Sequence, residues 1–293
     1  MSDSAADPSF ETNPLAPSDH LRQRQLISRI SGGIQTAAAL LAVGILGTVV
    51  WSVFSRGVSV LSLGFLTSDL PTGIAPAIVG TAVLIAIATV IAMPLGILIA
   101  LYETEFAGTR SGRALRLVLD VMNGIPTIIT GLFVFGLLVV GHHQSGFAGA
   151  FALSIVMLPL IARAAQEVLA TVPPSLREAA DALGVSHWRT VVGVVLPSAR
   201  SGILTAVVLA VARAAGETAP LILVTSLYAD SVSVNPFSSP ALANIPMYIF
   251  RASESDDRLG FARAWGAGFV LLSFILIVSL AARALERRSS SLR

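Results

Sequence analysis

Long apolar runs separated by short polar segments dominate the chain. A helix needs about 20 apolar residues to cross a bilayer core, and the runs approach or exceed that length. Apolar and polar positions do not alternate as in a β-barrel, so helices must satisfy the backbone within lipid. The pattern predicts an all-α, polytopic membrane protein with six transmembrane helices, at about Ile30–Phe54, Ala77–Leu101, Met122–Gly141, Phe147–Ile161 with its helical continuation, Gly202–Tyr228 and Phe261–Leu285.

Composition supports this assignment, because 54% of the residues are hydrophobic, 12% are charged and none is cysteine. These values are typical of a membrane protein without disulfides. The first twenty residues are polar and hold three prolines, which predicts a disordered cytosolic tail at 1–20 before a membrane domain at 21–293. The first apolar run is longer than the core of a cleavable signal peptide, so we expect that helix to remain in the mature chain.

Arginines are concentrated in alternate polar segments, and positive charge accumulates on the cytoplasmic side of membrane proteins. Only Arg56, Arg251 and Arg258 fall in segments on the opposite side. The distribution predicts that both termini are cytoplasmic. The inner arginines are Arg22, Arg24, Arg29, Arg110, Arg113, Arg116, Arg163, Arg177, Arg189, Arg200, Arg283, Arg287, Arg288 and Arg293.

A polar segment at about 163–201 contains Glu178-Ala179-Ala180, then Gly184, and finally Val194, Leu196 and Pro197. Ser175 and Glu178 have the spacing of a capping box, and Gly184 is suited to a left-handed helix cap. A short capped helix is one interpretation of these residues. Their spacing also resembles the docking loop of ABC-importer permeases, with Val194 in place of Ile, and the arginine distribution places this segment in the cytosol.

The chain contains no lysine, so it cannot form a phosphate-binding loop of the G-x-x-x-x-G-K type. We therefore expect no enzymatic activity and no cofactor in this chain, with ATP and Mg²⁺ held by a partner ATPase. The adjacent His142 and His143 lack the spacing of a metal site. We predict no metal site and no nucleic-acid binding.

Arg213 and Glu217 are charged residues within the fifth predicted span. A charge deep in a bilayer costs about 2.5–3.5 kcal/mol on insertion scales, which favours a position facing a pathway or a partner. A guanidinium is suited to binding an oxyanion, and Glu217 could accept a hydrogen bond from a protonated phosphate. The structural alternative is that the two residues neutralise each other. Gly216 permits close approach of a ligand or helix.

Arg213-Ala-Ala-Gly-Glu-Thr-Ala-Pro-Leu221 resembles the signature of the PstA permeases of phosphate-specific ABC importers, and Asn123-Gly-Ile-Pro-Thr127 is similar to the same family. The resemblance implies a type I ABC importer permease fold in a bacterial plasma membrane, with phosphate import by alternating access. The implied substrate-pathway residues are Arg213, Gly216, Glu217 and Thr218, and the implied ATPase-docking residues are Glu178, Ala179, Ala180, Gly184, Leu196 and Pro197.

The resemblance also implies an assembly with a PstC-like sister permease as heterodimer, two PstB-like ATPases, a PstS-like phosphate-binding protein and membrane lipid. The outer loop Ala229–Gly260 either docks the binding protein or is an ordinary solvated loop. The alternatives are a permease for sulfate or molybdate, because an arginine suits any oxyanion, and a secondary transporter, which commonly has more helices and repeated halves.

Overall fold

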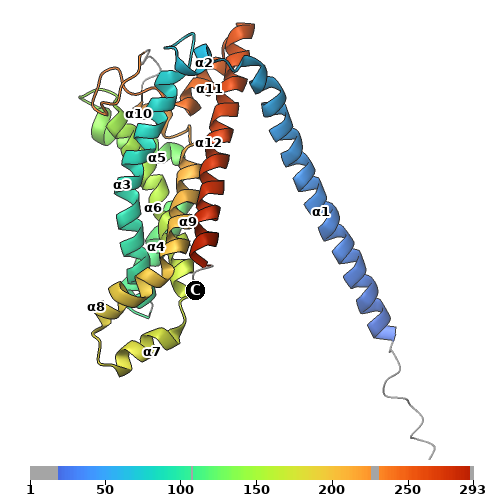
Figure 1. Ribbon diagram of the computed structural model, residues 1–293, viewed down its shortest axis with the longest axis vertical. Coiled ribbons are helices and arrows are strands. Elements are labelled where there is room, and N and C mark those ends of the chain that lie inside the picture. Colours follow the sequence, from blue (N-terminus) through green and yellow to red (C-terminus); the bar gives the residue numbers. More distant parts are fainter. Residues whose placement is uncertain (1–18, 107, 226–230, 291–293) are drawn as a thin grey trace, which may run out of the picture. The chain divides into compact units, whose positions relative to one another are not determined.

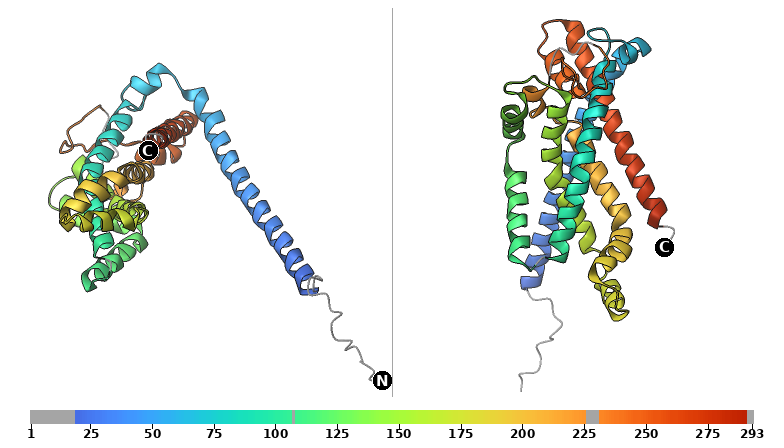
Figure 2. Two further views of the ribbon diagram at one scale, coloured as in Figure 1. Left: turned by 60° about the horizontal axis from the view of Figure 1, so that its bottom comes forward. Right: turned by 90° about the vertical axis from the view of Figure 1, so that its left-hand side faces the viewer.

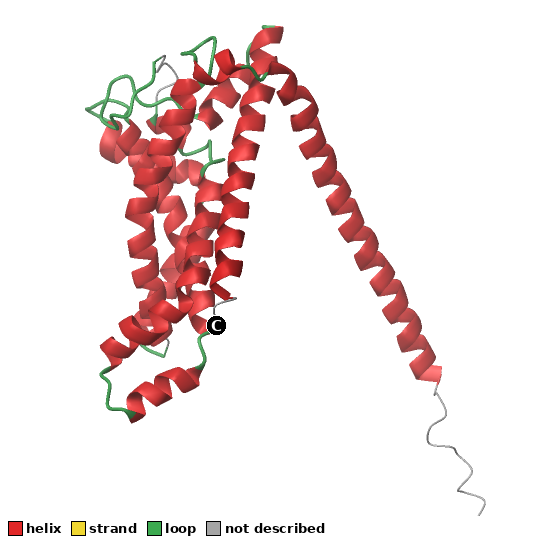
Figure 3. Cartoon of the chain, in the orientation of Figure 1, coloured by secondary structure: helices red, strands yellow, loops and turns green. Residues whose placement is uncertain are grey.

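A computed structural model describes residues 19–106, 108–225 and 231–290. The described residues form helices and loops without any strand (Figure 3). The all-α prediction is therefore confirmed. Most of the predicted tail at 1–20 lies outside the described residues. The chain divides into two compact units, Met1–Ser52 and Val53–Arg293.

The described part of the first unit consists of helix α1, which begins at Asp19 and runs past the unit boundary to Gly57. This helix carries the first candidate membrane span, and none of its apolar window is buried. Large apolar side chains such as Leu40, Leu41 and Leu46 are all exposed. A helix that is apolar on all sides is stable in lipid without a protein neighbour.

The second unit contains the remaining helices (Figure 1). Counting α1, five helices among the described residues are long and apolar enough to cross a membrane, or six when one bent pair counts as a single span. The elements are η2 (Val58–Val60), α2 (Leu63–Thr67), α3 (Ala75–Glu105), α4 (Arg110–Gly124), α5 (Thr127–Val134), η3 (Phe135–Val139), α6 (Gly146–Ala170), α7 (Pro174–Ala182), α8 (His187–Thr190), η4 (Val191–Val195), α9 (Leu196–Ala214), α10 (Leu221–Val224), α11 (Ile245–Ser253) and α12 (Arg258–Ser290).

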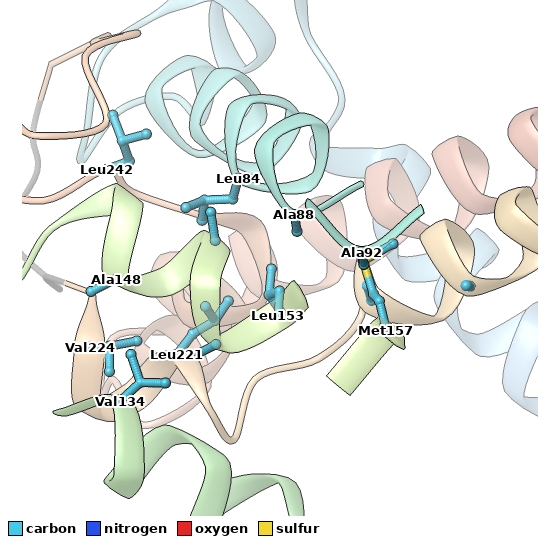
Figure 4. Packing of buried hydrophobic residues seen from close by; sticks show 14 of the residues in the cluster. Leu84, Ala88, Ala92, Val134, Ala148, Leu153, Met157, Leu221, Val224 and Leu242 are labelled. Carbon is cyan, nitrogen blue, oxygen red and sulfur yellow. The ribbon is translucent and has the colours of Figure 1, made fainter. Parts of the chain in front are cut away.

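Helices α3 and α6 lie side by side in the second unit (Figures 1 and 2). Ala88 and Ala92 of α3 belong to the same buried cluster as Leu153 and Met157 of α6 (Figure 4). Small residues let membrane helices approach closely, and van der Waals contact then stabilises the pair. Leu221 of α10 joins this cluster, so the core extends to the segment after α9.

The third predicted span, Met122–Gly141, is not one straight helix. Helix α4 ends at Gly124, and the axes of Arg110–Gly124 and Thr127–Val139 differ by 98°. Ile125 is extended, with ψ 127°, and Pro126 precedes the first residue of α5. A residue before proline disfavours the helical region, which explains the break. Pro94 and Pro159, in contrast, lie inside the continuous helices α3 and α6.

The fifth predicted span, Gly202–Tyr228, differs from the helix that is present, and its last residue lies outside the described residues. The helical run begins at His187, passes through the π-helical turn η4 and ends at Ala214. Gly216 and Pro220 follow within six residues; glycine lowers helix propensity and proline lacks the amide that a continuing helix requires. Glu217 therefore lies beyond the helix that holds Arg213.

Candidate functional site

The two helix breaks lie against each other. We call this region the junction and define it as residues 123–127 and 213–220. Gly131, one turn into α5, packs directly on Pro220: a Cβ at Gly131 would lie 2.7 Å from both the Cα and the carbonyl oxygen of Pro220. Only glycine permits this backbone contact. The two sequence motifs that carry the family resemblance are thus brought together by one close approach.

Arg213 lies in the last turn of α9, and its side chain is 62% exposed. Its Nε is 3.8 Å from Oε1 of Glu217, whose side chain is only 17% exposed. The hydroxyl of Thr127 donates to the other oxygen, Oε2, at 3.5 Å. The predicted i,i+4 ion pair is present, but it spans the end of α9. The Glu217 carboxylate also links the segment after α9 to the start of α5, because it accepts the bond from Thr127.

A cavity of about 60 Å³ opens at the junction. Its lining includes Asn123, Thr127, Thr130 and Arg213, with Pro159 of α6 on another side. An amide, two hydroxyls and a guanidinium can all donate hydrogen bonds. The N-terminus of α5 adds partial positive charge, because its first amide groups lack partners within the helix. This arrangement can bind an anion.

Gly216 and Thr218 have different roles in the fold. Gly216 is exposed, and a Cβ there would meet nothing closer than the Arg213 carbonyl oxygen at 3.7 Å, so packing within this chain does not require glycine. The Thr218 carbonyl accepts the amides of Leu221 and Ile222 at the start of α10. Their participation in a substrate pathway stays a prediction.

Helix α7 is the centre of the predicted docking segment, but its capping differs from the prediction. The N-cap is Pro173, and no side chain caps the helix, so the expected Ser175–Glu178 capping box is absent. The left-handed cap at Gly184 is confirmed, with φ +70°. The Val185 amide donates to the Ala180 carbonyl at 3.0 Å and the Gly184 amide to Asp181 at 2.9 Å. These two bonds form a Schellman motif, which satisfies carbonyls that the helix end leaves free.

The predicted docking residues divide into surface and packed positions. Glu178, Ala179, Gly184 and Pro197 are exposed. Ala180 is buried, and Leu196 packs against the cluster that includes Leu169, Val195 and Ile203. The fold therefore uses two of the six residues to hold the segment and leaves four accessible.

Two large apolar side chains lie on this segment's surface: Leu183 is 82% exposed and Trp188 is 70% exposed. Both lie near α7 and α8, at the end of the second unit opposite α2 and α11 (Figure 1). Apolar side chains exposed beside a short polar helix can form part of a protein contact surface.

A larger cavity, of about 380 Å³, lies at the end that carries α11. Tyr248, Arg251, Asp257 and Arg263 contribute to its lining, and Arg263 donates to the Pro71 carbonyl at 2.8 Å. Burial raises the pKa of the Tyr248 hydroxyl above its usual range, and the Arg263 guanidinium opposes that shift. The cavity thus combines two cations with one carboxylate.

Two buried carboxylates at the end of α3 were missed by the sequence reasoning. Glu103 is fully buried, with Arg116 Nε and Arg163 Nη1 each 3.9 Å from one of its oxygens. Glu105 is 8% exposed and pairs with Arg177 and His187. The available signal was the position of two acids directly after a long apolar run. Their partners lie far away in sequence, and the run gave no indication of them.

The arrangement of helices defines a class of protein. The chain matches the fold of a bacterial alginate ABC transporter crystallised with an alginate-bound periplasmic protein, with a TM-score of 0.63 and 16% identity, over 91% of this chain and 95% of that one. It also matches the inward-facing MetNI methionine ABC transporter, with a TM-score of 0.57 and 20% identity, over 74% of this chain and 94% of that one. The fold is that of type I ABC importer permeases.

Residues 92–291 match the family of binding-protein-dependent transport system inner membrane components, and the chain belongs to this family. It is 36% identical over 281 residues to the phosphate transport system permease protein PstA of Xylella fastidiosa (strain Temecula1), covering 93% of this chain and 97% of that protein. It is 38% identical over 221 residues to the protein PstA 1 of Mycobacterium tuberculosis (strain H37Rv), covering 75% and 71%. The probable PstA of Methanocaldococcus jannaschii is 34% identical, covering 90% and 95%.

Proposed function

We propose that this chain is a permease subunit of an ATP-driven ABC importer that carries inorganic phosphate into the cell. Relatives at 33–38% identity bear the name of phosphate transport permeases. The observation that carries the proposal is the junction: an exposed Arg213 beside a Glu217 that is itself bonded to Thr127. These groups supply both hydrogen-bond donors and one acceptor for an oxyanion that retains a proton.

The acceptor distinguishes phosphate from other oxyanions. A guanidinium presents several N–H groups in a planar fork and stays charged at every physiological pH, so it attracts any oxyanion. Near neutral pH, phosphate still carries a proton that can be donated to Glu217, whereas sulfate carries none. Sulfate is therefore attracted by Arg213 but repelled by the Glu217 carboxylate, without a hydrogen bond to offset that repulsion. This reasoning favours phosphate over the sulfate or molybdate alternative.

A second permease completes the pathway in this proposal. The Arg213 side chain is 62% exposed in the isolated chain, although charge is costly when it faces lipid. A PstC-like sister subunit at this face would enclose the guanidinium and contribute the other half of the route. Gly216 is exposed and has no side chain, so it would allow that subunit or the substrate to approach Arg213 closely.

A PstB-like ATPase pair would bind the docking segment from the cytosol, with both termini of this chain on the same side. Glu178, Ala179 and Gly184 are exposed there, and Leu183 and Trp188 offer apolar surface. ATP-driven closure of the partner would move α7, and the junction would then alternate between outward and inward access. The chain has no lysine and therefore no phosphate-binding loop of the G-x-x-x-x-G-K type, which supports assigning ATP hydrolysis to a separate chain.

A PstS-like binding protein would dock at the opposite end. The 380 Å³ cavity there carries Arg251 and Arg263, which are suited to acidic side chains on a partner surface. The outer loop predicted from the sequence includes α11 and therefore one wall of this cavity.

Reconstitution tests the proposal. The chain, copurified with its partner subunits, is inserted into liposomes, and uptake of labelled phosphate is measured with the binding protein outside and ATP inside. We expect ATP-dependent uptake that a tenfold excess of sulfate or molybdate does not reduce. Uptake in the Glu217→Gln variant should fall by about tenfold, the factor that 1.4 kcal/mol represents, and should become sensitive to sulfate.

The competing functions give different results in the same assay. A sulfate or molybdate permease would transport those anions and show competition in the unmodified complex. A secondary transporter would respond to an ion gradient and would copurify without an ATPase. Glu167→Gln, which changes an exposed carboxylate on α6, is the matched control and should transport normally.

A further inference from the structure

The last turn of α3 carries two carboxylates that serve different neighbours. Residues two positions apart in a helix lie about 200° apart around its axis, so Glu103 and Glu105 point to nearly opposite sides. Glu103 lies between Arg116 of α4 and Arg163 of α6. Glu105 points to the docking segment. The end of α3 therefore links this segment to two further helices of the membrane domain.

Glu105 contacts both limbs of the docking segment. Nη2 of Arg177, in α7, is 3.2 Å from Oε1, and Nε2 of His187, the first residue of α8, is 3.3 Å from Oε2. Gly184 turns the chain between these two helices. One carboxylate thus holds the docking segment on either side of its turn.

Burial makes this contact stronger than an ordinary surface ion pair. The Glu105 side chain is 8% exposed and that of Arg177 is 25% exposed. Separating a buried carboxylate from its guanidinium partner leaves an uncompensated charge, which is costly. Arg177 also donates to the Val172 carbonyl at 3.4 Å, directly after α6. A displacement of α7 therefore costs the least free energy when the end of α3 moves with it.

We propose that Glu105 is a positioning residue that couples the docking segment to α3, so that a movement imposed on α7 by the ATPase is passed into the membrane domain. The inference rests on the proposed function, because it requires an ATPase bound at this segment. Glu105 contacts neither ATP nor substrate. Its role is to keep Arg177 and His187 attached to the same transmembrane helix.

The main test compares transport with ATP consumption in the reconstituted complex. Glu105→Gln retains the shape of the side chain and removes its charge. We expect ATP hydrolysis to persist while phosphate taken up per ATP falls roughly tenfold. Glu167→Gln, an exposed carboxylate on the inner half of α6, is the matched control and should leave the ratio unchanged.

Two further variants separate coupling from simple stability. Exchanging the charges, as Glu105→Arg with Arg177→Glu, should restore most of the lost ratio, because the pair is rebuilt with reversed sign. His187→Gln removes the more exposed partner and should lower the ratio about twofold. A merely structural role would reduce the yield of assembled complex and leave uptake per ATP unchanged in the complex that forms.

A substrate-independent measurement distinguishes this inference from the proposed function. The chain has no cysteine, so spin labels can be placed at Leu98→Cys on α3 and Ala182→Cys on α7, which are both exposed. We expect the distance between the two labels to stay constant when nucleotide binds to the unmodified complex. In Glu105→Gln, the distribution of this distance should broaden. If the unmodified complex hydrolyses ATP but transports no phosphate, the proposed function is wrong. The label distance still shows whether α7 and α3 move together.

The inference is overturned if Glu105→Gln keeps both the unmodified ratio of uptake to ATP and a constant label distance. It is also overturned if Glu105→Gln loses coupling but the charge exchange restores nothing. Should Glu105→Gln fail to assemble, Arg177→Gln and His187→Gln decide the question, and unchanged ratios in both would contradict the coupling role.

Discussion

The junction and the inner end of α3 both contain arginine–carboxylate pairs, but the two regions differ in which charged groups are buried. At the junction, the Arg213 side chain is 62% exposed and its closest carboxylate atom is 3.8 Å away. At the end of α3, Glu103 is fully buried between two arginines, and Glu105 is 8% exposed between Arg177 and His187. One region leaves a cation accessible, and the other encloses its anions.

The difference indicates which charges the fold itself uses. A buried carboxylate with several cationic partners is a structural element, because removing a partner leaves a charge in a low-dielectric interior. An exposed guanidinium gains little from a loose pair. The remaining N–H groups of Arg213 are therefore available to a substrate or a partner subunit. Substitutions in the two regions should accordingly affect different properties.

The largest expected effect is on transport, at the junction. Arg213→Gln removes the fixed positive charge that attracts the anion, and we expect uptake to fall by roughly a thousandfold, or about 4 kcal/mol, as for loss of a charge partner in a closed site. Uptake of labelled phosphate into liposomes measures this change. The thermal unfolding midpoint in detergent should stay the same, because the side chain is mostly exposed.

Arg113→Gln provides the control, since Arg113 is an exposed arginine on α4, the helix that leads to the junction. It should transport at the unmodified rate. Normal uptake by Arg213→Gln would leave that residue only the neutralising role that the sequence also permitted.

The second largest effect is expected at the end of α3, where a substitution should lower the free energy of unfolding. Arg163→Gln leaves the fully buried Glu103 carboxylate with one cation, Arg116, at 3.9 Å, and also removes the contact with Asp120. We expect a loss of about 3 kcal/mol in the free energy of unfolding, measured by denaturant titration in detergent. A stability equal to that of Arg113→Gln would show that the cation beside Glu103 contributes little, and the contrast between the two regions would fail.

Much of the fold follows from the sequence because lipid restricts the options. Apolar runs of sufficient length predict helices, and the described residues contain no other regular structure. The ends of helices are harder, because local residues compete with the apolar pattern. Pro126 breaks the third span, and Gly216 with Pro220 ends the fifth, although the surrounding residues are apolar enough to suggest continuation.

Contacts between segments distant in sequence explain the rest of the candidate site. Arg213 and Glu217 could be paired from their spacing, and Gly184 could be assigned a left-handed cap from its position. The bond from Thr127 to Glu217 joins residues 90 positions apart, and Arg177 is 72 positions from Glu105. The bond between Thr127 and Glu217 forms only because α5 packs on the segment after α9. No periodicity within either segment predicts that packing.

A smaller effect should come from separating the two halves of the junction. Gly131→Ala would place a methyl group 2.7 Å from the Pro220 backbone, which cannot rotate away. Overpacking of this kind costs about 2 kcal/mol, and the shift should also lengthen the Thr127–Glu217 bond. We expect a lower unfolding midpoint and reduced uptake together. Gly136→Ala, where a Cβ meets nothing within 4 Å, is the matched control, and equal effects of the two variants would contradict the close approach.

The smallest effect is expected at the turn of the docking segment. Gly184 has φ +70° but open space around its Cα, so Gly184→Ala should cost about 1 kcal/mol from the left-handed conformation alone. If the Schellman turn positions Glu178 for the ATPase, phosphate uptake per ATP should fall about fivefold, which is the same free energy. Gly193→Ala also has open space, but its backbone is helical, so this control should keep the ratio. Comparable losses in both variants would assign the effect to added bulk on the docking surface, and the turn would then have no separate part in coupling.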